Sequence, residues 1–150
     1  MSRDYQRSCC YGWEDRYIHA KDNSVIPFDQ AQAIVDYVWE KAGLMYPPKV
    51  EAISKTAIRT LAKADRLRIR IPQHGIKTTV LLHEIAHSMT SEAMGGSDGH
   101  GARFVEVFTG LVCEHIPTFR MAELIEAARL GGVDSGQPPR ATAKQRRARR

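Results

Sequence analysis

The chain has 150 residues, of which 43% are hydrophobic and 26% are charged, close to the averages for soluble globular proteins. This length and composition fit one domain with one core, and they exclude a collagen, a chain that is disordered throughout and a disulfide scaffold. No apolar stretch approaches the roughly 18–20 residues of a membrane-spanning helix, and the start of the sequence lacks the apolar segment of a secretory signal. We therefore expect a cytoplasmic protein with no membrane partner.

The net charge of +5 arises at the C-terminal end. Residues 140–150 hold six basic residues and no acidic one, and the rest of the chain has 16 basic against 17 acidic residues. Residues 133–150 also have few apolar side chains, which predicts a disordered basic tail after a single domain at 1–132. The tail 140–150 either contacts the phosphates of nucleic acid or keeps the protein soluble. It has no aromatic residue to stack on bases.

Two helices are expected before residue 49. Residues 4–18 carry an aromatic stripe (Tyr11, Trp13, Tyr17) that we interpret as packing. Residues 29–42 carry an apolar stripe at helical spacing, and Asp29 with Gln32 matches a capping box at the start of this second helix. A glycine at 43 and two prolines at 47–48 indicate where it ends.

Residues 49–72 change to the spacing of strands. Apolar pairs around 50–53 are compatible with a strand, and 56–64 fits either a strand or a helix. In the stretch 66–72, Leu67, Ile69 and Ile71 alternate with three arginines. This alternation predicts a strand with one buried face and one solvated face, which Pro72 ends.

Helical spacing returns at residues 77–94, where Thr78 or Thr79 is expected to cap the helix. Residues 95–101 hold four glycines in seven positions and must form a loop. An amphipathic helix is expected over 102–115. Pro117 starts a last helix that ends at about Leu130, before two glycines.

The helix at 77–94 contains His83-Glu84-Ile85-Ala86-His87, an H-E-x-x-H motif. Residues four apart lie on one face of a helix, about one turn from each other, so both imidazoles can bind one Zn²⁺. Glu84 can then reach a zinc-bound water without being a ligand itself. Because Zn²⁺ lowers the pKa of that water toward about 7, the glutamate can take its proton during attack on a carbonyl. The plainer interpretation is two histidines on a helix face beside a surface charge.

A catalytic zinc site usually has three protein ligands and an open position for water. His100, at the end of the glycine-rich loop, is the preferred third ligand, and Glu106 and Asp98 are alternatives. If His100 binds the metal, Asp98 or Glu106 could instead hold the tautomer of an imidazole. The plainer interpretations are a turn residue for Asp98 and a solvated helix face for Glu106.

The motifs HEIAH (83–87) and HGARF (100–104) together resemble those of the SprT-like and related small zincin metallopeptidases. This resemblance implies that His100 is the third zinc ligand, that Glu84 is the base and that Phe104 belongs to the core. Over about residues 3–130 the chain also resembles short metallohydrolases of bacterial and phage genomes, whose opening is similar to QRSCCYGWE (6–14) here. The function of that second group is inferred from its metal site alone.

The chain departs from SprT-like proteins in having no C-x-x-C pair, so it lacks their C-terminal zinc ribbon. In zincins the strand before the metal-binding helix commonly lines the substrate cleft as an edge, and residues 66–71 take that position here. Such an edge binds extended peptides, and its arginines would favour acidic ones. The plainer interpretation is a solvated face that discourages edge pairing. No oxyanion-stabilising residue can be assigned, and His74 is the first to examine.

The sequence thus predicts an α+β, zincin-like fold, with a small, mostly antiparallel sheet of about three strands, surrounding helices and the metal-binding helix 77–94. The expected function is that of a zinc metallopeptidase. Zn²⁺ would be held by His83, His87 and His100, and Glu84 would activate water against a peptide or protein substrate. One alternative is hydrolysis of a non-peptide amide. The other is a non-catalytic binding module, with structural zinc and a basic tail that contacts nucleic acid or an acidic partner.

Overall fold

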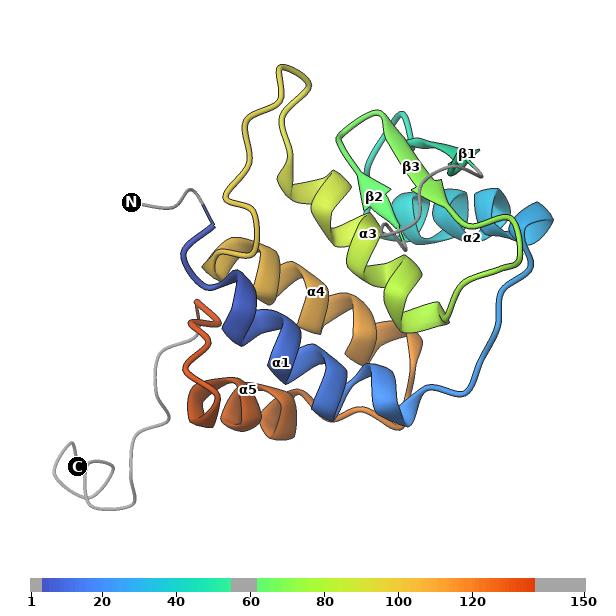
Figure 1. Ribbon diagram of the computed structural model, residues 1–150. Coiled ribbons are helices and arrows are strands. Elements are labelled where there is room, and N and C mark those ends of the chain that lie inside the picture. Colours follow the sequence, from blue (N-terminus) through green and yellow to red (C-terminus); the bar gives the residue numbers. More distant parts are fainter. Residues whose placement is uncertain (1–3, 55–61, 137–150) are drawn as a thin grey trace, which may run out of the picture.

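The computed structural model describes residues 4–54 and 62–136, and over these residues the fold is α+β, as predicted (Figure 1). The helices are α1 (Arg7–Tyr17), the short 3-10 helix η1 (His19–Lys21), α2 (Phe28–Lys41), α3 (Thr78–Thr90), α4 (Ala102–His115) and α5 (Met121–Leu130). The strands are β1 (Lys49–Ala52), β2 (Lys63–Ala64) and β3 (Arg68–Ile71). The expected helices are therefore confirmed in order, although α5 begins at Met121 rather than at Pro117.

The three-stranded sheet is mixed rather than mostly antiparallel, with the strand order β1-β3-β2. β1 pairs with β3 in parallel, with Lys49 opposite Arg68 and Ala52 opposite Ile71, whereas β2 pairs with β3 antiparallel through two residues. Alternation in the sequence indicates which face of a strand is buried, but it carries no information on the direction of the neighbouring strand. The pairing could therefore not be read from the pattern.

β3 has one buried and one solvated face, as predicted, with Ile69 and Ile71 fully buried. Leu67, expected on the buried face, lies before the strand begins and is 59% exposed. It is the central strand of the described sheet, so the prediction that it forms an edge is wrong. Strands β1 and β2 occupy its two hydrogen-bonding sides, which leaves no free side for an extended peptide.

The three arginines around β3 contact groups of this same chain. The Nε atoms of Arg68 and Arg70 lie 3.7 and 3.6 Å from the carboxylate of Glu51 on β1. The guanidinium of Arg66 lies 4.7 Å from the ring centroid of Trp39, and it donates to carbonyl oxygens between α2 and β1. These contacts favour the plainer interpretation of a solvated face over a surface for acidic substrates.

The helix α3 lies between the sheet and α4, and α1 and α5 complete the far side of the molecule (Figure 1). Because α3 is covered on both sides, four of its apolar residues are almost completely buried: Leu81, Leu82, Ile85 and Ala86. A helix in this position is held rigidly by its neighbours, which makes it a good support for a site.

The predicted N-caps of α3 (Thr78 or Thr79) and of α2 (Asp29 with Gln32) are both wrong. At the start of α3, side chains from a distant segment accept from the free N–H groups instead. The N–H of Thr79 donates to the carboxylate of Asp22 at 2.8 Å, and the N–H of Thr78 donates to the hydroxyl of Ser24 at 3.1 Å. Both acceptors come from the connection between α1 and α2.

At the start of α2 the N-cap is Pro27, without a side-chain cap. Gln32, expected to complete a capping box with Asp29, instead accepts from the N–H of Val50 at 2.7 Å and donates to the carbonyl of Pro48 at 3.1 Å. This side chain therefore joins α2 to β1.

The first residues of the predicted tail pack against the domain. Val133 and Ser135 are buried, and the N–H of Asp134 donates to Gln6 Oε1 at 2.8 Å. The basic stretch 140–150 lies outside the described residues, as does most of the segment 56–64, of which Lys63–Ala64 is a strand. Within the described part of the chain, no helix is long and apolar enough to cross a membrane.

Candidate metal centre

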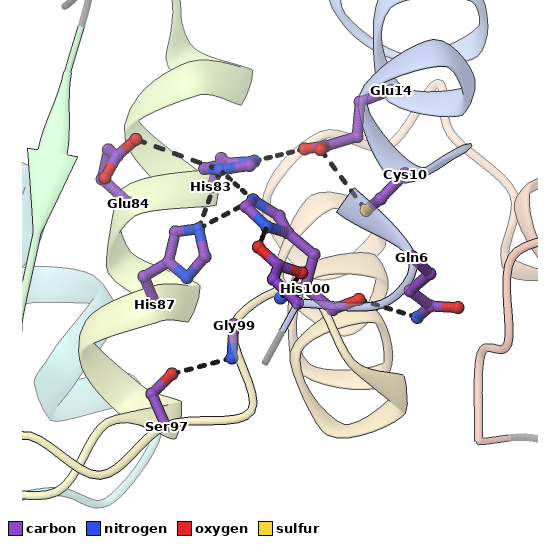
Figure 2. A network of polar contacts seen from close by, with 10 residues as sticks. Gln6, Cys10, Glu14, His83, Glu84, His87, Ser97, Gly99 and His100 are labelled. Carbon is purple, nitrogen blue, oxygen red and sulfur yellow. Dashed lines mark hydrogen bonds and ion pairs between the residues drawn. The ribbon is translucent and has the colours of Figure 1, made fainter. Parts of the chain in front are cut away.

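Three imidazoles converge between α3 and the start of α4 (Figure 2). His83 and His87 lie one turn apart on α3, and His100 lies two residues before α4. Their Nε2 atoms are separated by 3.0 Å (His83 to His87), 3.1 Å (His87 to His100) and 3.4 Å (His83 to His100). Nitrogen ligands at about 2.0–2.1 Å from a tetrahedral Zn²⁺ lie roughly 3.3 Å from one another. The three nitrogens are thus spaced as ligands of one shared metal ion.

The chemistry of these donors also fits a metal ion. Three nitrogen lone pairs at this separation repel each other unless a proton or a cation lies between them. Burial lowers the pKa of His87, and the positive charges that His83 and His100 would carry lower it further, to about 2. His87 is therefore neutral at physiological pH, which is the state that binds a metal.

Carboxylates hold the other ring nitrogen of two of the histidines. Nδ1 of His83 donates to Glu14 on α1. Nδ1 of His100 donates to Oδ2 of Asp4 at 2.7 Å, and Oδ1 of Asp4 accepts from the backbone N–H of His100 at 2.9 Å. A proton held on Nδ1 leaves Nε2 free, so these contacts select the tautomer that can bind a metal.

Glu14 is fully buried, yet it is ionised. Burial by itself raises the pKa of this carboxyl, but hydrogen bonds with His19 and His83 outweigh burial and hold the pKa at about 2. The thiol of Cys10 donates to its second oxygen at 3.5 Å. An ionised carboxylate accepts hydrogen bonds only, so Nδ1 of His83 must carry the proton.

Neither Asp98 nor Glu106 holds an imidazole, so the plainer interpretations, a turn residue and a solvated helix face, apply to them. Asp98 accepts from the N–H of Arg103 at 3.2 Å at the start of α4, and Glu106 is exposed. Asp4 and Glu14, which take this role, lie 96 and 69 residues from their histidines in sequence, so no local spacing indicates them. The one available signal was the stretch 6–14, which includes Glu14 and carries the resemblance to the short metallohydrolases.

The ring of Phe104 forms the floor of the cluster. It is fully buried, and its centroid lies 4.9, 4.3 and 5.0 Å from those of His83, His87 and His100. Its predicted place in the core is confirmed. The ring of Tyr11, interpreted from the sequence as packing, lies 4.8 Å from that of His100 and so forms part of the wall of the cluster.

Glu84 lies close to the point where the three nitrogens meet. Its Oε1 is 4.0 Å from Nε2 of His83, and its side chain is buried (Figure 2). Burial raises the pKa of Glu84 to about 7, although the charge of His83 acts to lower it. A carboxyl group with this pKa can both take and release a proton near neutral pH.

A second group of metal-binding atoms consists of Glu14, His19 and His83. Glu14 and His83 are already joined by their hydrogen bond, and Nδ1 of His19 lies 2.8 Å from the hydroxyl of Thr79. The atoms of this group are therefore already engaged in hydrogen bonds, and through Glu14 the group holds His83 in place for the first cluster. His74, the first candidate for stabilising an oxyanion, is exposed in the loop before α3.

No protein-family model, curated protein or solved structure matches this chain. The class of the site therefore follows from its own geometry: a buried cluster of three histidines that can hold a metal ion. Membership of the SprT-like or related metallohydrolase families stays a prediction from the motifs.

Proposed function

We propose that the protein is a zinc-dependent hydrolase that cleaves peptide bonds. One observation carries this proposal: three Nε2 atoms lie 3.0–3.4 Å apart, with the Glu84 carboxylate 4.0 Å from one of them. Structural zinc sites are usually closed by four protein ligands, whereas catalytic sites leave one position open. Among the described residues, no fourth His, Cys, Asp or Glu joins this group, which supports catalysis over a structural zinc in a binding module.

Each side chain has a role that its environment supports. Bound Zn²⁺ supplies Lewis-acid chemistry, which polarises a carbonyl and makes a water more acidic. Glu84 would take the proton of the attacking water and pass it to the leaving amine, a role supported by its buried carboxylate 4.0 Å from Nε2 of His83. Glu14 and Asp4 hold His83 and His100 in the binding tautomer. The choice of a peptide over another amide follows from the resemblance of the motifs.

Two substitutions separate metal binding from hydrolysis. Protein purified without added metal should carry about one zinc per chain, and His100→Ala should lose most of it. Glu84→Gln should keep the zinc but reduce hydrolysis of labelled casein by about 10²–10⁴-fold, the usual contribution of a general base. Glu106→Gln, the same change at an exposed position, is the matched control and should alter neither quantity.

Undiminished turnover in Glu84→Gln would overturn the mechanism. Absence of zinc from the wild type, even after zinc is offered, would overturn the proposed function. The contact of residues 140–150 with nucleic acid stays a separate prediction, because these residues lie outside the described part of the chain.

A further inference from the structure

A cavity of about 410 Å³ lies at the N-terminal end of α3. Its walls come from the end of α1 and η1, from the connection that leads to α2, and from residues 72–80, which run from the end of β3 into the first turn of α3. Ligand pockets in proteins commonly measure about 300–1,000 Å³, so this one is large enough for a sizeable group. The residues that carry the proposed hydrolysis, Glu84, His83, His87 and His100, do not line this cavity.

Val80 shows where the cavity lies relative to the metal centre. It is four residues before Glu84 and three before His83, so it lies on the same face of α3, roughly one turn of 5.4 Å toward the N-terminus. On the opposite wall, the ring centroid of His19 is 6.3 Å from that of His83. The wall of the cavity at Val80 therefore lies about one helical turn from Glu84.

The walls of the cavity are held in place by contacts between distant segments. Ile26 and Ile76 exchange two backbone hydrogen bonds, of 2.7 and 3.0 Å. Lys77 donates from Nζ to the carbonyl of His19 at 2.9 Å. Gly75 has φ +110°, and a Cβ at this position would lie 2.8 Å from the carbonyl oxygen of Ile26, so only glycine lets the two segments approach. The cavity is thus pre-formed, as ligand pockets usually are.

The lining of the cavity is mainly apolar. Val25, Pro72, Ile76 and Val80 contribute aliphatic surface, and the Val25 side chain is 69% exposed although it belongs to this lining. Asp15 and Lys77 carry opposite charges, and the other polar side chains of the lining are the imidazoles of His19 and His74, so the lining has no strong net charge of either sign. A ligand that covers Val25 and Val80 would remove apolar surface from water, which favours an apolar group.

We propose that this cavity is a specificity subsite, which takes a large aliphatic or aromatic side chain of the substrate next to the scissile amide. The proposal rests on the proposed function, because the metal centre defines where the scissile bond lies. The pocket recognises the side chain by its apolar surface, while the charged groups at the rim stay in water.

The test compares two hydroxamates, which bind through the same metal-binding group, on the Co²⁺-loaded protein, followed by its visible spectrum. Acetohydroxamate has only a methyl group, whereas 3-phenylpropionohydroxamate carries a phenyl ring that can reach the cavity. We expect the phenyl compound to bind at least about tenfold more tightly to the wild type, equal to about 1.4 kcal/mol. Val80→Asn and, separately, Val25→Asn should remove this preference without weakening acetohydroxamate. Leu130→Asn, at an exposed position outside the cavity, should keep it.

Equal affinities for the two hydroxamates in the wild type would overturn the subsite and leave the metal centre intact. Failure of both to bind, with no Co²⁺ retained, would instead overturn the proposed function. A measurement on the metal-free protein then tests whether the cavity binds an aromatic side chain. If it does, N-acetylphenylalanine amide should shift the methyl NMR signals of Val25, Ile76 and Val80. Absence of these shifts would overturn the subsite whatever the metal result.

Discussion

Replacing Asp4 by asparagine tests whether the segment before α1 sets the metal affinity of the site. Asp4 accepts two hydrogen bonds from His100, at 2.7 Å from Nδ1 and at 2.9 Å from the backbone N–H. Asparagine has nearly the same shape but only one side-chain oxygen. One of the two donors of His100 would therefore face an NH₂ group, so asparagine would hold the imidazole and the backbone of His100 less firmly than the carboxylate does.

The size of the effect follows from burial. A buried donor that loses its partner costs about 1–3 kcal/mol. His100 is only 5% exposed, but the Asp4 side chain is 25% exposed, so water can replace part of the lost contact. We therefore expect zinc affinity to fall by about 10–100-fold, the range seen for partners of metal ligands, which is about 1.4–2.7 kcal/mol.

Competition for zinc with a chromophoric chelator measures this affinity directly. Asp98→Asn is the matched control, because it makes the same change two residues from His100 at a carboxylate that accepts from Arg103 instead. Its zinc affinity should stay within about twofold of the wild type. The reasoning is refuted if Asp4→Asn leaves the affinity unchanged, or if both variants weaken it equally.

Three further predictions concern stability. In the metal-free protein, the pKa of Glu14 (about 2) lies below its ordinary value of 4.5, so its stabilisation is complete above pH 4.5 and is lost as pH falls toward 2. Urea unfolding between pH 5 and 2.5 should depend less on pH in Glu14→Gln, and an identical slope would contradict this. Phe104→Ala should lower the free energy of unfolding by about 3–5 kcal/mol, because the ring is fully buried, whereas Leu130→Ala at the surface should change it by less than about 0.5 kcal/mol. Zinc at a free concentration of about 1,000 times its Kd should stabilise the fold by about 4 kcal/mol and raise Tm, and EDTA should reverse this rise. A Tm that changes with neither zinc nor EDTA would count against the metal site.

Local features of the sequence were sufficient to locate the proposed ligands. His83 and His87 share one helical face because the period of a helix is 3.6 residues. The glycines of 95–101 indicate a loop that can bring His100 back to that face. The burial of Ile69 and Ile71 likewise follows from alternation along one strand. Each of these inferences depends only on residues that are near one another in the chain.

Contacts between distant segments were decided by the tertiary structure alone. Asp4 and Glu14 reach the histidines across 96 and 69 residues of sequence, and Asp22 caps α3 across 57. The parallel pairing of β1 with β3 and the cavity beside Val80 likewise depend on how separate elements meet. A carboxylate in the sequence has many potential partners, and only packing of the helices selects one. The chain itself therefore indicates which histidines could hold a metal ion, while the fold determines which groups orient them and which cavity lies beside them.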